Sequence, residues 1–239
     1  MVEISVDYLL FDLDGTLVNS TAAVEKNWHD TVNVHNSEYP DLVIDPVTFL
    51  QVSHGSRTVD TFKKHFPYRS SDEDAVGKFE FDIVQKYGHL AQEIEGTSTL
   101  LSSIEEQFPT RWAIVTSGTQ DLAHGWFKKL FGNLSFPRVF ITANDVTEGK
   151  PNPEGYLAAF HQLCQIGNTS PQSSTAVVFE DAPTGIRAGI NGGFKVIGIA
   201  STFDKDVLLA AGATYVIKDM HSITFKKNSH GIKLCLDVL

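Results

Sequence analysis

Two aspartates near the start of the chain, Asp12 and Asp14, have the types and the spacing of a phosphoryl-transfer pair. They follow the apolar run at 8–11 and precede Gly15 and Thr16. A strand that ends there places both carboxyl groups on the same side, because side chains two residues apart share a face. One carboxylate can then attack while the other transfers a proton. An ordinary acidic turn, which Asp and Gly also favour, is the alternative.

A second apolar run, at 112–115, ends in Thr116, Ser117 and Gly118 just before a helix-like segment. The hydroxyl of Thr116 and the backbone amides that follow it can donate hydrogen bonds to phosphate oxygens. Thr116 and Ser117 are therefore candidate phosphate-binding residues. A simple capped turn has the same sequence pattern and stays open as the alternative.

Lys150 and an acidic pair, Glu180 and Asp181, complete the set of candidate residues. Lys150 stands between two turn-forming residues, so its side chain has less freedom to lose on binding an anion. Glu180 and Asp181 end the apolar run at 176–179. Carboxylates at the end of a buried strand are costly without compensation, which a hard cation with oxygen ligands supplies. A helix cap made by Asp181 is the alternative.

The composition limits the class of protein. The chain has 239 residues, 42% apolar and 20% charged, as expected of a globular enzyme with a core and a modest insertion. Its net charge of −10 disfavours nucleic acid or an anionic membrane as a partner. We see neither a run of about 20 apolar residues nor a signal sequence, and 2 cysteines are too few for a disulfide framework. We therefore expect a cytoplasmic protein, and a monomer because no apolar surface stripe stands out.

The hydrophobic pattern predicts an α/β fold with a parallel sheet. Short runs that are apolar throughout alternate with amphipathic segments, as in a parallel sheet covered by helices on both faces. The predicted strands are Asp7–Phe11, Trp112–Val115, Arg138–Ile141, Ala176–Phe179, Lys195–Ile199 and Tyr215–Ile217. The predicted helices between the later strands are Asp121–Phe131, Pro153–Cys164, Pro183–Asn191 and Asp204–Ala211. Near the chain end, Ser222–Lys226 and Ile232–Leu236 flank the turn-forming segment 228–231, which predicts a terminal β-hairpin.

The segment between the first two strands predicts a small helical cap. Residues 19–93 contain no convincing core strand, so we divide the chain into a core of residues 1–18 and 94–239 and a cap of residues 19–93. An insertion directly after the carboxylate turn would lie over the carboxyl edge of the sheet, where open parallel sheets bind ligands. The helix-like patterns are Thr21–His35, Arg57–Phe66 and Asp72–His89, separated by loops that contain Pro40, Pro46 and Pro67.

The order of these motifs resembles that of the haloacid dehalogenase superfamily of phosphotransferases over essentially the whole chain. Within this superfamily, the chain resembles in particular the fungal 2-deoxyglucose-6-phosphate and glycerol-3-phosphate phosphatases. Where relatives often carry Pro-Gly at the return from the insertion to the core, this chain has Glu95-Gly96. The segments that carry the narrower likeness are SHGSRT at 53–58, WAIVTSGT at 112–119, FITANDV at 140–146, GKPNPEGY at 149–156 and VVFEDAPTGI at 177–186.

The resemblance implies a Rossmann-like core with a helical cap inserted after the first strand, and a Mg²⁺-dependent phosphatase that hydrolyses a small sugar or polyol phosphate. It implies that Asp12 is the nucleophile, which forms an aspartyl-phosphate, and that Asp14 is the general acid and base. It also implies that Mg²⁺ is held by Asp12, the backbone carbonyl of Asp14 and Asp181. Glu180 is a possible further metal residue.

The resemblance also implies which residues contact the substrate. Thr116, Ser117 and Lys150 are expected to bind the phosphate group. Arg57 resembles the cap-loop residue that reaches the substrate when the cap closes, and His54 is a second candidate beside it. A surface helix start and a structural histidine are the alternatives for these two. A cap that seals the site excludes phosphoproteins, so the expected partner is a small phosphate ester.

Three other functions stay open at this stage. A phosphomutase similar to β-phosphoglucomutase shares every motif, and isomerisation of a hexose 1-phosphate instead of phosphate release would identify it. A haloacid dehalogenase is disfavoured because a departing halide needs no proton, which leaves Asp14 without a task. A non-catalytic ligand-sensing regulator would keep the fold, but none of the expected catalytic residues is missing.

Overall fold

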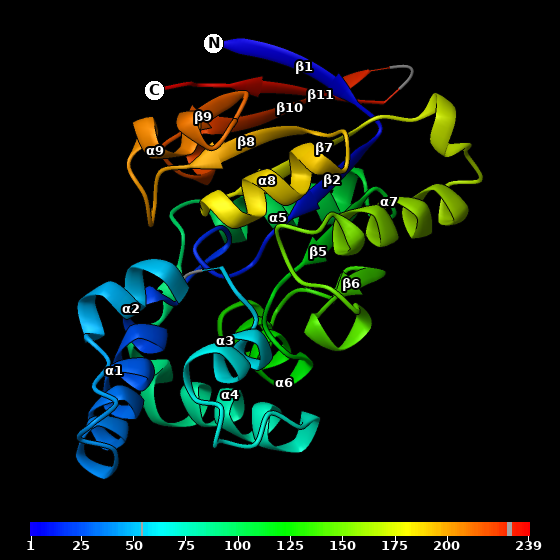
Figure 1. Cartoon of the computed structure of the whole chain (residues 1–239). Coiled ribbons are helices and arrows are strands. Elements are labelled where there is room, and N and C mark those ends of the chain that lie inside the picture. Colours follow the sequence, from blue (N-terminus) through cyan, green and yellow to red (C-terminus); the bar gives the residue numbers. More distant parts are fainter. Residues whose placement is uncertain (54, 229–230) are drawn as a thin grey trace.

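A six-stranded parallel sheet forms the centre of the computed structural model (Figure 1). The structure describes residues 1–53, 55–228 and 231–239. The strand order is β6-β5-β2-β7-β8-β9, and every predicted core strand is confirmed to within one residue at each end. The strands are β2 (Tyr8–Phe11), β5 (Trp112–Val115), β6 (Val139–Ile141), β7 (Ala176–Glu180), β8 (Lys195–Ile199) and β9 (Tyr215–Ile217).

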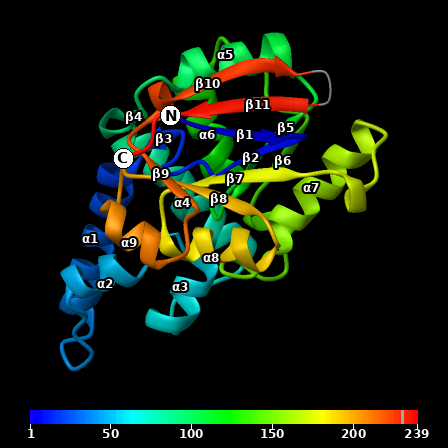
Figure 2. The ribbon, with the colours of Figure 1, turned by 90° about the horizontal axis from the view of Figure 1, so that it is seen from above.

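Helices cover both faces of this sheet, which explains why its strands are apolar throughout. Along β2, Leu9 and Phe11 belong to one hydrophobic cluster, and Tyr8 and Leu10 to the other, because alternate side chains face opposite sides. Figure 2 shows the two sides from above. The first cluster includes α5 (Thr97–Gln107) and α6 (Gln120–Phe131), and the second includes α7 (Glu154–Ile166), α8 (Pro183–Asn191) and α9 (Lys205–Ala210).

A second, antiparallel sheet joins the two ends of the chain. The predicted hairpin is confirmed as β10 (Ile223–Asn228) and β11 (Gly231–Leu236), with its turn residues 229 and 230 outside the described residues. The sequence pattern did not predict its third strand, β1 (Val2–Val6), which pairs with β11. A five-residue run of ordinary alternation carries little signal until its distant partner is known.

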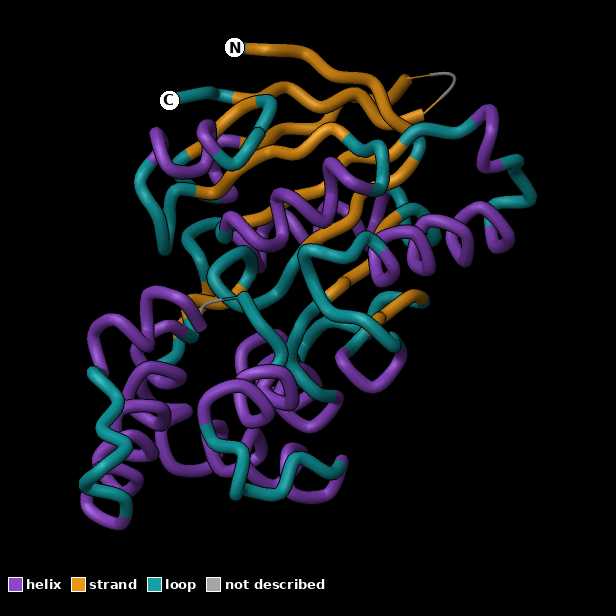
Figure 3. Tube along the Cα trace, in the orientation of Figure 1, coloured by secondary structure: helices purple, strands orange, loops and turns teal. Residues whose placement is uncertain are grey.

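The insertion forms a bundle of helices, which Figure 3 shows at one end of the molecule. The chain enters and leaves it through the antiparallel pair β3 (Val18–Asn19) and β4 (Gln92–Glu93). The prediction of a loop at Pro46 is wrong, because α2 begins at this residue. Proline fits the first turn of a helix, where its missing N–H is not needed. The helices are α1 (Thr21–Glu38), α2 (Pro46–Ser53), α3 (Thr58–His65) and α4 (Glu73–Tyr87), with α4 packed against α6. Within the described residues, no helix combines the length and the apolar character needed to cross a bilayer.

Aromatic side chains form the core of this bundle. Phe62 is fully buried, and its ring centroid lies 5.8 Å from that of Trp28 and 5.0 Å from that of Phe79. The guanidinium of Arg69 lies 4.9 Å from the same ring centroid, on the outer side of the cluster. Phe62, on α3, therefore packs against both α1 and α4.

We expect Phe62→Ala to lower the free energy of unfolding by about 3–5 kcal/mol, because it removes a large buried side chain and leaves a cavity. Urea denaturation measures the change. Phe81→Ala is the matched control, since Phe81 lies on α4 with 48% of its surface exposed and should cost about 0.5 kcal/mol or less. Equal losses in the two variants would contradict this description of the bundle core.

Candidate active site

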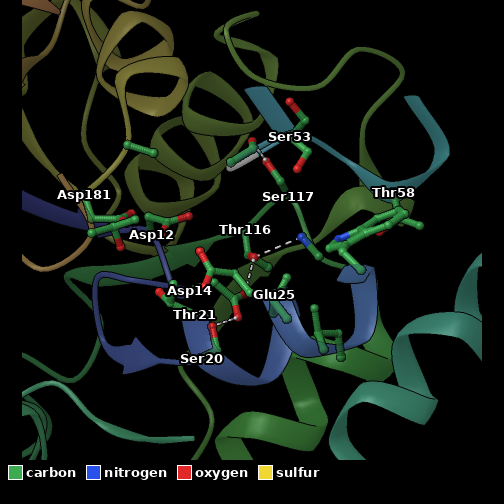
Figure 4. Close-up of a pocket in the computed structure, with 18 of the residues that line it drawn as sticks. Asp12, Asp14, Ser20, Thr21, Glu25, Ser53, Thr58, Thr116, Ser117 and Asp181 are labelled. Carbon is green, nitrogen blue, oxygen red and sulfur yellow. Dashed lines mark hydrogen bonds between the residues drawn. The ribbon is translucent and has the colours of Figure 1, made fainter. Parts of the chain in front are cut away.

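The carboxyl ends of three neighbouring strands bring the candidate residues together. Because β2 lies between β5 and β7, Asp12 at the end of β2 meets Thr116 on one side and Asp181 on the other. The backbone amide of Asp12 donates to the carbonyl of Phe179 at 3.0 Å, which fixes the end of β2 against β7. Figure 4 shows Asp12 and Asp181 side by side, with Asp14 and Thr116 next to them. The pocket that these residues line extends to the helices of the insertion.

Lys150 is the central contact of the pocket. Its Nζ donates to Asp12 Oδ1 at 2.5 Å, to Glu180 Oε1 at 2.6 Å and to the carbonyl of Val115 at 3.1 Å. Burial lowers the pKa of Lys150, but the negative charges of Asp12 and Glu180 outweigh burial and raise that pKa above its usual value. The ammonium therefore stays charged between the two carboxylates.

Glu180 holds Lys150 and has little capacity left for another partner. Its Oε1 accepts from Lys150 and from the hydroxyl of Tyr156, at 2.8 Å. Its Oε2 accepts from the backbone amides of Asp181 and Ala182, at 3.1 and 3.2 Å. The sequence pattern had not singled out Tyr156, although it lies in the segment that follows Lys150. These four hydrogen bonds fix Glu180 as an anchor.

Asp12 also carries a carboxylate oxygen that no described residue satisfies. Oδ2 of Asp12 is buried and accepts no hydrogen bond from the described part of the chain. Oxygens of Asp12, Glu180 and Asp181 lie within 4.8 Å of one another. Burial and the charge of Glu180 raise the pKa of Asp12 to about 7, and burial with the charge of Asp12 raises the pKa of Asp181 well above its usual value. Lys150 pairs with only two of these three carboxyl groups, so the cluster keeps an excess of negative charge that a divalent cation with oxygen ligands would offset.

Asp14 lies two residues further on, in a turn that depends on Gly15. Gly15 has a φ of +86°, and a Cβ at that position would overlap the carboxylate of Asp181. Ser20 Oγ donates to Asp14 Oδ1 at 2.6 Å, and Thr116 Oγ1 donates to Asp14 Oδ2 at 3.4 Å (Figure 4). Burial raises the pKa of Asp14, and the hydrogen bond from Ser20 opposes this. The sequence pattern had not identified Ser20 as its partner.

The predicted phosphate-binding residues line the same pocket, but some of their donors are already used. The amide of Gly118 donates to Thr116 Oγ1 at 3.0 Å. Ser117 Oγ donates to the carbonyl of Gly55, in the insertion, at 3.0 Å. Thr116, Ser117 and Lys150 all face the pocket that Asp12 lines.

Arg57 lies apart from the aspartates, in a small neighbouring cavity that it lines with Ser117 and Lys150. Its guanidinium pairs with Asp60 at 2.8 Å and donates to the carbonyls of Val146 and Thr147, at 3.2 and 3.0 Å. These contacts tie the insertion to the loop that precedes Lys150. A contact between Arg57 and a substrate would require the guanidinium to leave Asp60 and the two backbone carbonyls. His54, the other predicted cap residue, lies outside the described residues.

Glu80, on α4, is a pocket residue that the sequence pattern did not reveal. It is 2% exposed, its Oε1 accepts from the hydroxyl of Thr58, and its Oε2 accepts from the amide of Thr119 at 2.6 Å. Burial raises the pKa of Glu80 to about 6, although both hydrogen bonds oppose the shift. A carboxylate between the buried residues Phe79 and Ile83 on an otherwise apolar helix face was the available signal.

We expect Glu80→Gln to change how stability depends on pH. In the unfolded chain the carboxyl group of Glu80 ionises near pH 4.5, whereas in the folded protein it ionises only near pH 6. Glu80 therefore stabilises the folded state below pH 4.5, and this contribution is lost as the pH rises through 6. The free energy of unfolding of the wild type, relative to Glu80→Gln, should fall by about 2 kcal/mol over that interval.

Urea denaturation of the metal-free protein at several pH values measures this difference. Asp82→Asn is the matched control, because Asp82 lies on the same helix and pairs with Lys86 at the surface. Stability curves of wild type and Glu80→Gln that stay parallel from pH 4 to 7 would show that Glu80 is not buried as described.

Known proteins resemble this chain along most of its length. A family model described as haloacid dehalogenase-like hydrolase matches residues 9–199. The chain is 41% identical to 2-deoxyglucose-6-phosphate phosphatase 2 of Saccharomyces cerevisiae, over 96% of this chain and 94% of that protein. It is 40% identical to glycerol-1-phosphate phosphohydrolase 2 of the same yeast, over 93% of this chain and 86% of that protein. The crystal structure of a hydrolase from Pseudomonas syringae shares the fold, with a TM-score of 0.72 and 24% sequence identity. The match covers 90% of this chain and 94% of that one.

Proposed function

The chain belongs to the haloacid dehalogenase-like hydrolases, and we propose that it is a Mg²⁺-dependent phosphatase of small sugar or polyol phosphates. One observation carries this proposal. Lys150 binds Oδ1 of Asp12 at 2.5 Å, Oδ2 of Asp12 is buried and accepts no hydrogen bond from the described residues, and Asp14 lies two residues away. Two relatives are named for the hydrolysis of 2-deoxyglucose 6-phosphate and glycerol 1-phosphate, which supports this substrate class.

In the proposed mechanism, Asp12 and Asp14 divide the work. A carboxylate oxygen of Asp12 attacks phosphorus, a bond forms between them, and the bond from phosphorus to the alcohol oxygen breaks. Asp14 gives its proton to the departing alcohol. Water then attacks the phosphorus, Asp14 takes a proton from this water, and Asp12 is released as a carboxylate. The raised pKa of Asp14 supports its role as the acid.

Thr116 and Lys150 are the proposed contacts of the phosphate group, with Ser117 beside them. A phosphate monoester carries a charge of about −1.5 to −2, which the single ammonium of Lys150 does not neutralise. Asp12, Asp181 and the backbone carbonyl of Asp14 would hold Mg²⁺, which when bound would balance this charge. The four hydrogen bonds of Glu180 support a role in holding Lys150 and not in binding the ion directly.

We also propose the domain division stated from the sequence, with a core of residues 1–18 and 94–239 and a cap of residues 19–93. The aromatic contacts of Phe62 with Trp28 and Phe79 inside the insertion, and the narrow crossing at β3 and β4, support it. A cap that closes over the pocket would limit substrates to small esters, with Arg57 and His54 as its proposed substrate contacts. The monomeric state and the cytoplasmic location stay predictions.

We expect Asp12→Asn to lower kcat by about 10³-fold or more, because an amide oxygen is a poor nucleophile. Release of inorganic phosphate from a panel of small esters, with Mg²⁺ present, measures the activity. Asp41→Asn, an exposed aspartate in the insertion, is the control and should keep full activity. If Asp12→Asn released phosphate at the wild-type rate, the assignment of Asp12 as the nucleophile would be refuted. Isomerisation of a hexose 1-phosphate without phosphate release would favour the phosphomutase instead.

We expect removal of Mg²⁺ by a chelator to abolish phosphate release. Calorimetry should show that Asp181→Asn weakens Mg²⁺ binding by about tenfold or more, because one of the anionic oxygens of the cluster is lost. Asp219→Asn is the matched control, since Asp219 is also buried but caps a short helical turn elsewhere. Equal Mg²⁺ affinity of wild type and Asp181→Asn would contradict the proposed ligand set.

A further inference from the structure

A short segment of the insertion, residues 55–57, binds the core beside the pocket. Ser117 Oγ, just beyond β5, donates to the carbonyl of Gly55 at 3.0 Å. The guanidinium of Arg57 donates to two backbone carbonyls of the loop that precedes Lys150, at 3.2 and 3.0 Å. Two separate loops of the core therefore bind the same short segment of the insertion.

The fit between this segment and the core is close at two glycines. Gly55 has a φ of +75°, and a Cβ at that position would lie 2.4 Å from Oγ1 of Thr184, in the core. On the other side, a Cβ at Gly149 would lie 2.7 Å from Nε of Arg57. Neither glycine leaves room for a side chain without a shift of its neighbour.

Each of the two core loops also carries a proposed contact of the phosphate group. Ser117 directly follows Thr116, with which it lines the pocket (Figure 4), and Gly149 directly precedes Lys150. A serine hydroxyl has a single proton to donate, and Ser117 donates it to the carbonyl of Gly55. The same proton is therefore not available to a phosphate oxygen while this bond is present.

We propose that Ser117 is a positioning residue, whose hydroxyl holds residues 55–57 of the insertion beside the pocket instead of donating to the phosphate group. This inference rests on the proposed phosphatase function and assigns a further residue of that site. When Arg57 turns to a substrate, its guanidinium leaves the core carbonyls, but the bond between Ser117 and Gly55 can stay. Ser117 thus keeps Arg57 near the substrate while the guanidinium changes partners.

Two variants and their combination test this role. Ser117→Ala removes the hydroxyl, and Gly55→Ala displaces the carbonyl that accepts from it, because alanine is strained at a φ of +75° and its Cβ would press on Thr184. We expect each to lower kcat/KM about fivefold or more, for the small ester that the wild type hydrolyses fastest. The double variant should match Gly55→Ala to within about twofold, because the hydroxyl has already lost its acceptor.

Limited proteolysis with trypsin measures the same contact without a substrate. Trypsin cleaves after arginine, and the side chain of Arg57 is 11% exposed in its bonded position. Loss of the bond between Ser117 and Gly55 should free this segment more often, so cleavage after Arg57 should be about fivefold faster in either single variant. The double variant should not exceed Gly55→Ala. Cleavage after Arg69, an exposed site elsewhere in the insertion, should keep the wild-type rate in all variants.

Gly193→Ala is the matched control for the glycine substitution. Gly193 also has a positive φ, of +82°, but a Cβ there would meet no heavy atom of the described residues within 4 Å. This variant carries the same kind of backbone strain far from the contact with Ser117. It should keep the wild-type kcat/KM and the wild-type rate of cleavage after Arg57.

Losses of kcat/KM that multiply in the double variant would overturn the inference, because Ser117 would then act on a group other than Gly55, such as the phosphate. So would a Ser117→Ala protein with the wild-type kcat/KM, or with the wild-type rate of cleavage after Arg57. Absence of phosphate release from every ester would instead overturn the proposed function. Faster cleavage after Arg57 would then still show that Ser117 holds the segment.

Discussion

The ammonium of Lys150 between Asp12 and Glu180 is the interaction on which the rest of the pocket depends. It joins the ends of β2, β5 and β7, because it also binds the last carbonyl of β5. At an effective dielectric constant of about 20, two carboxylates about 4 Å apart repel by roughly 4 kcal/mol. Without a cation between them, Asp12 and Glu180 could not both stay ionised in a buried position.

This contact also explains how one acidic residue becomes available for chemistry. Lys150 holds Oδ1 of Asp12 and so orients the carboxylate, while Oδ2 accepts no hydrogen bond from the part of the chain that the structure describes. Glu180 is saturated by four hydrogen bonds and acts through Lys150, whereas Asp14 is held by Ser20 at the edge of the pocket. The surroundings of the acids thus differ, which supports the different tasks proposed for them. A strongly acidic protein can bind a phosphate when its few local cations are fixed in this way.

The sequence predicted the core well and the contacts across the insertion poorly, for physical reasons. Strands buried on both faces are apolar throughout, so the pattern revealed them and the polar residues at their carboxyl ends, among them Asp12, Thr116 and Asp181. That β2 lies between β5 and β7, which brings these three residues together, was not predicted from the sequence. The first strand, β1, depends on pairing with a segment at the other end of the chain. The partners of Arg57 and Glu80 are set by how the insertion packs on the core, which periodicity does not encode.

Chemical trapping of the phosphorylated enzyme tests the central claim most directly. Acid quenching during turnover, followed by borohydride, reduces an aspartyl-phosphate to the alcohol, and mass spectrometry of the peptides locates the reduced residue. The account predicts reduction at Asp12 alone, only when a substrate and Mg²⁺ are both present, and release of the alcohol before inorganic phosphate. A reduced residue elsewhere, or steady phosphate release with no phosphorylated protein at any quench time, would contradict it.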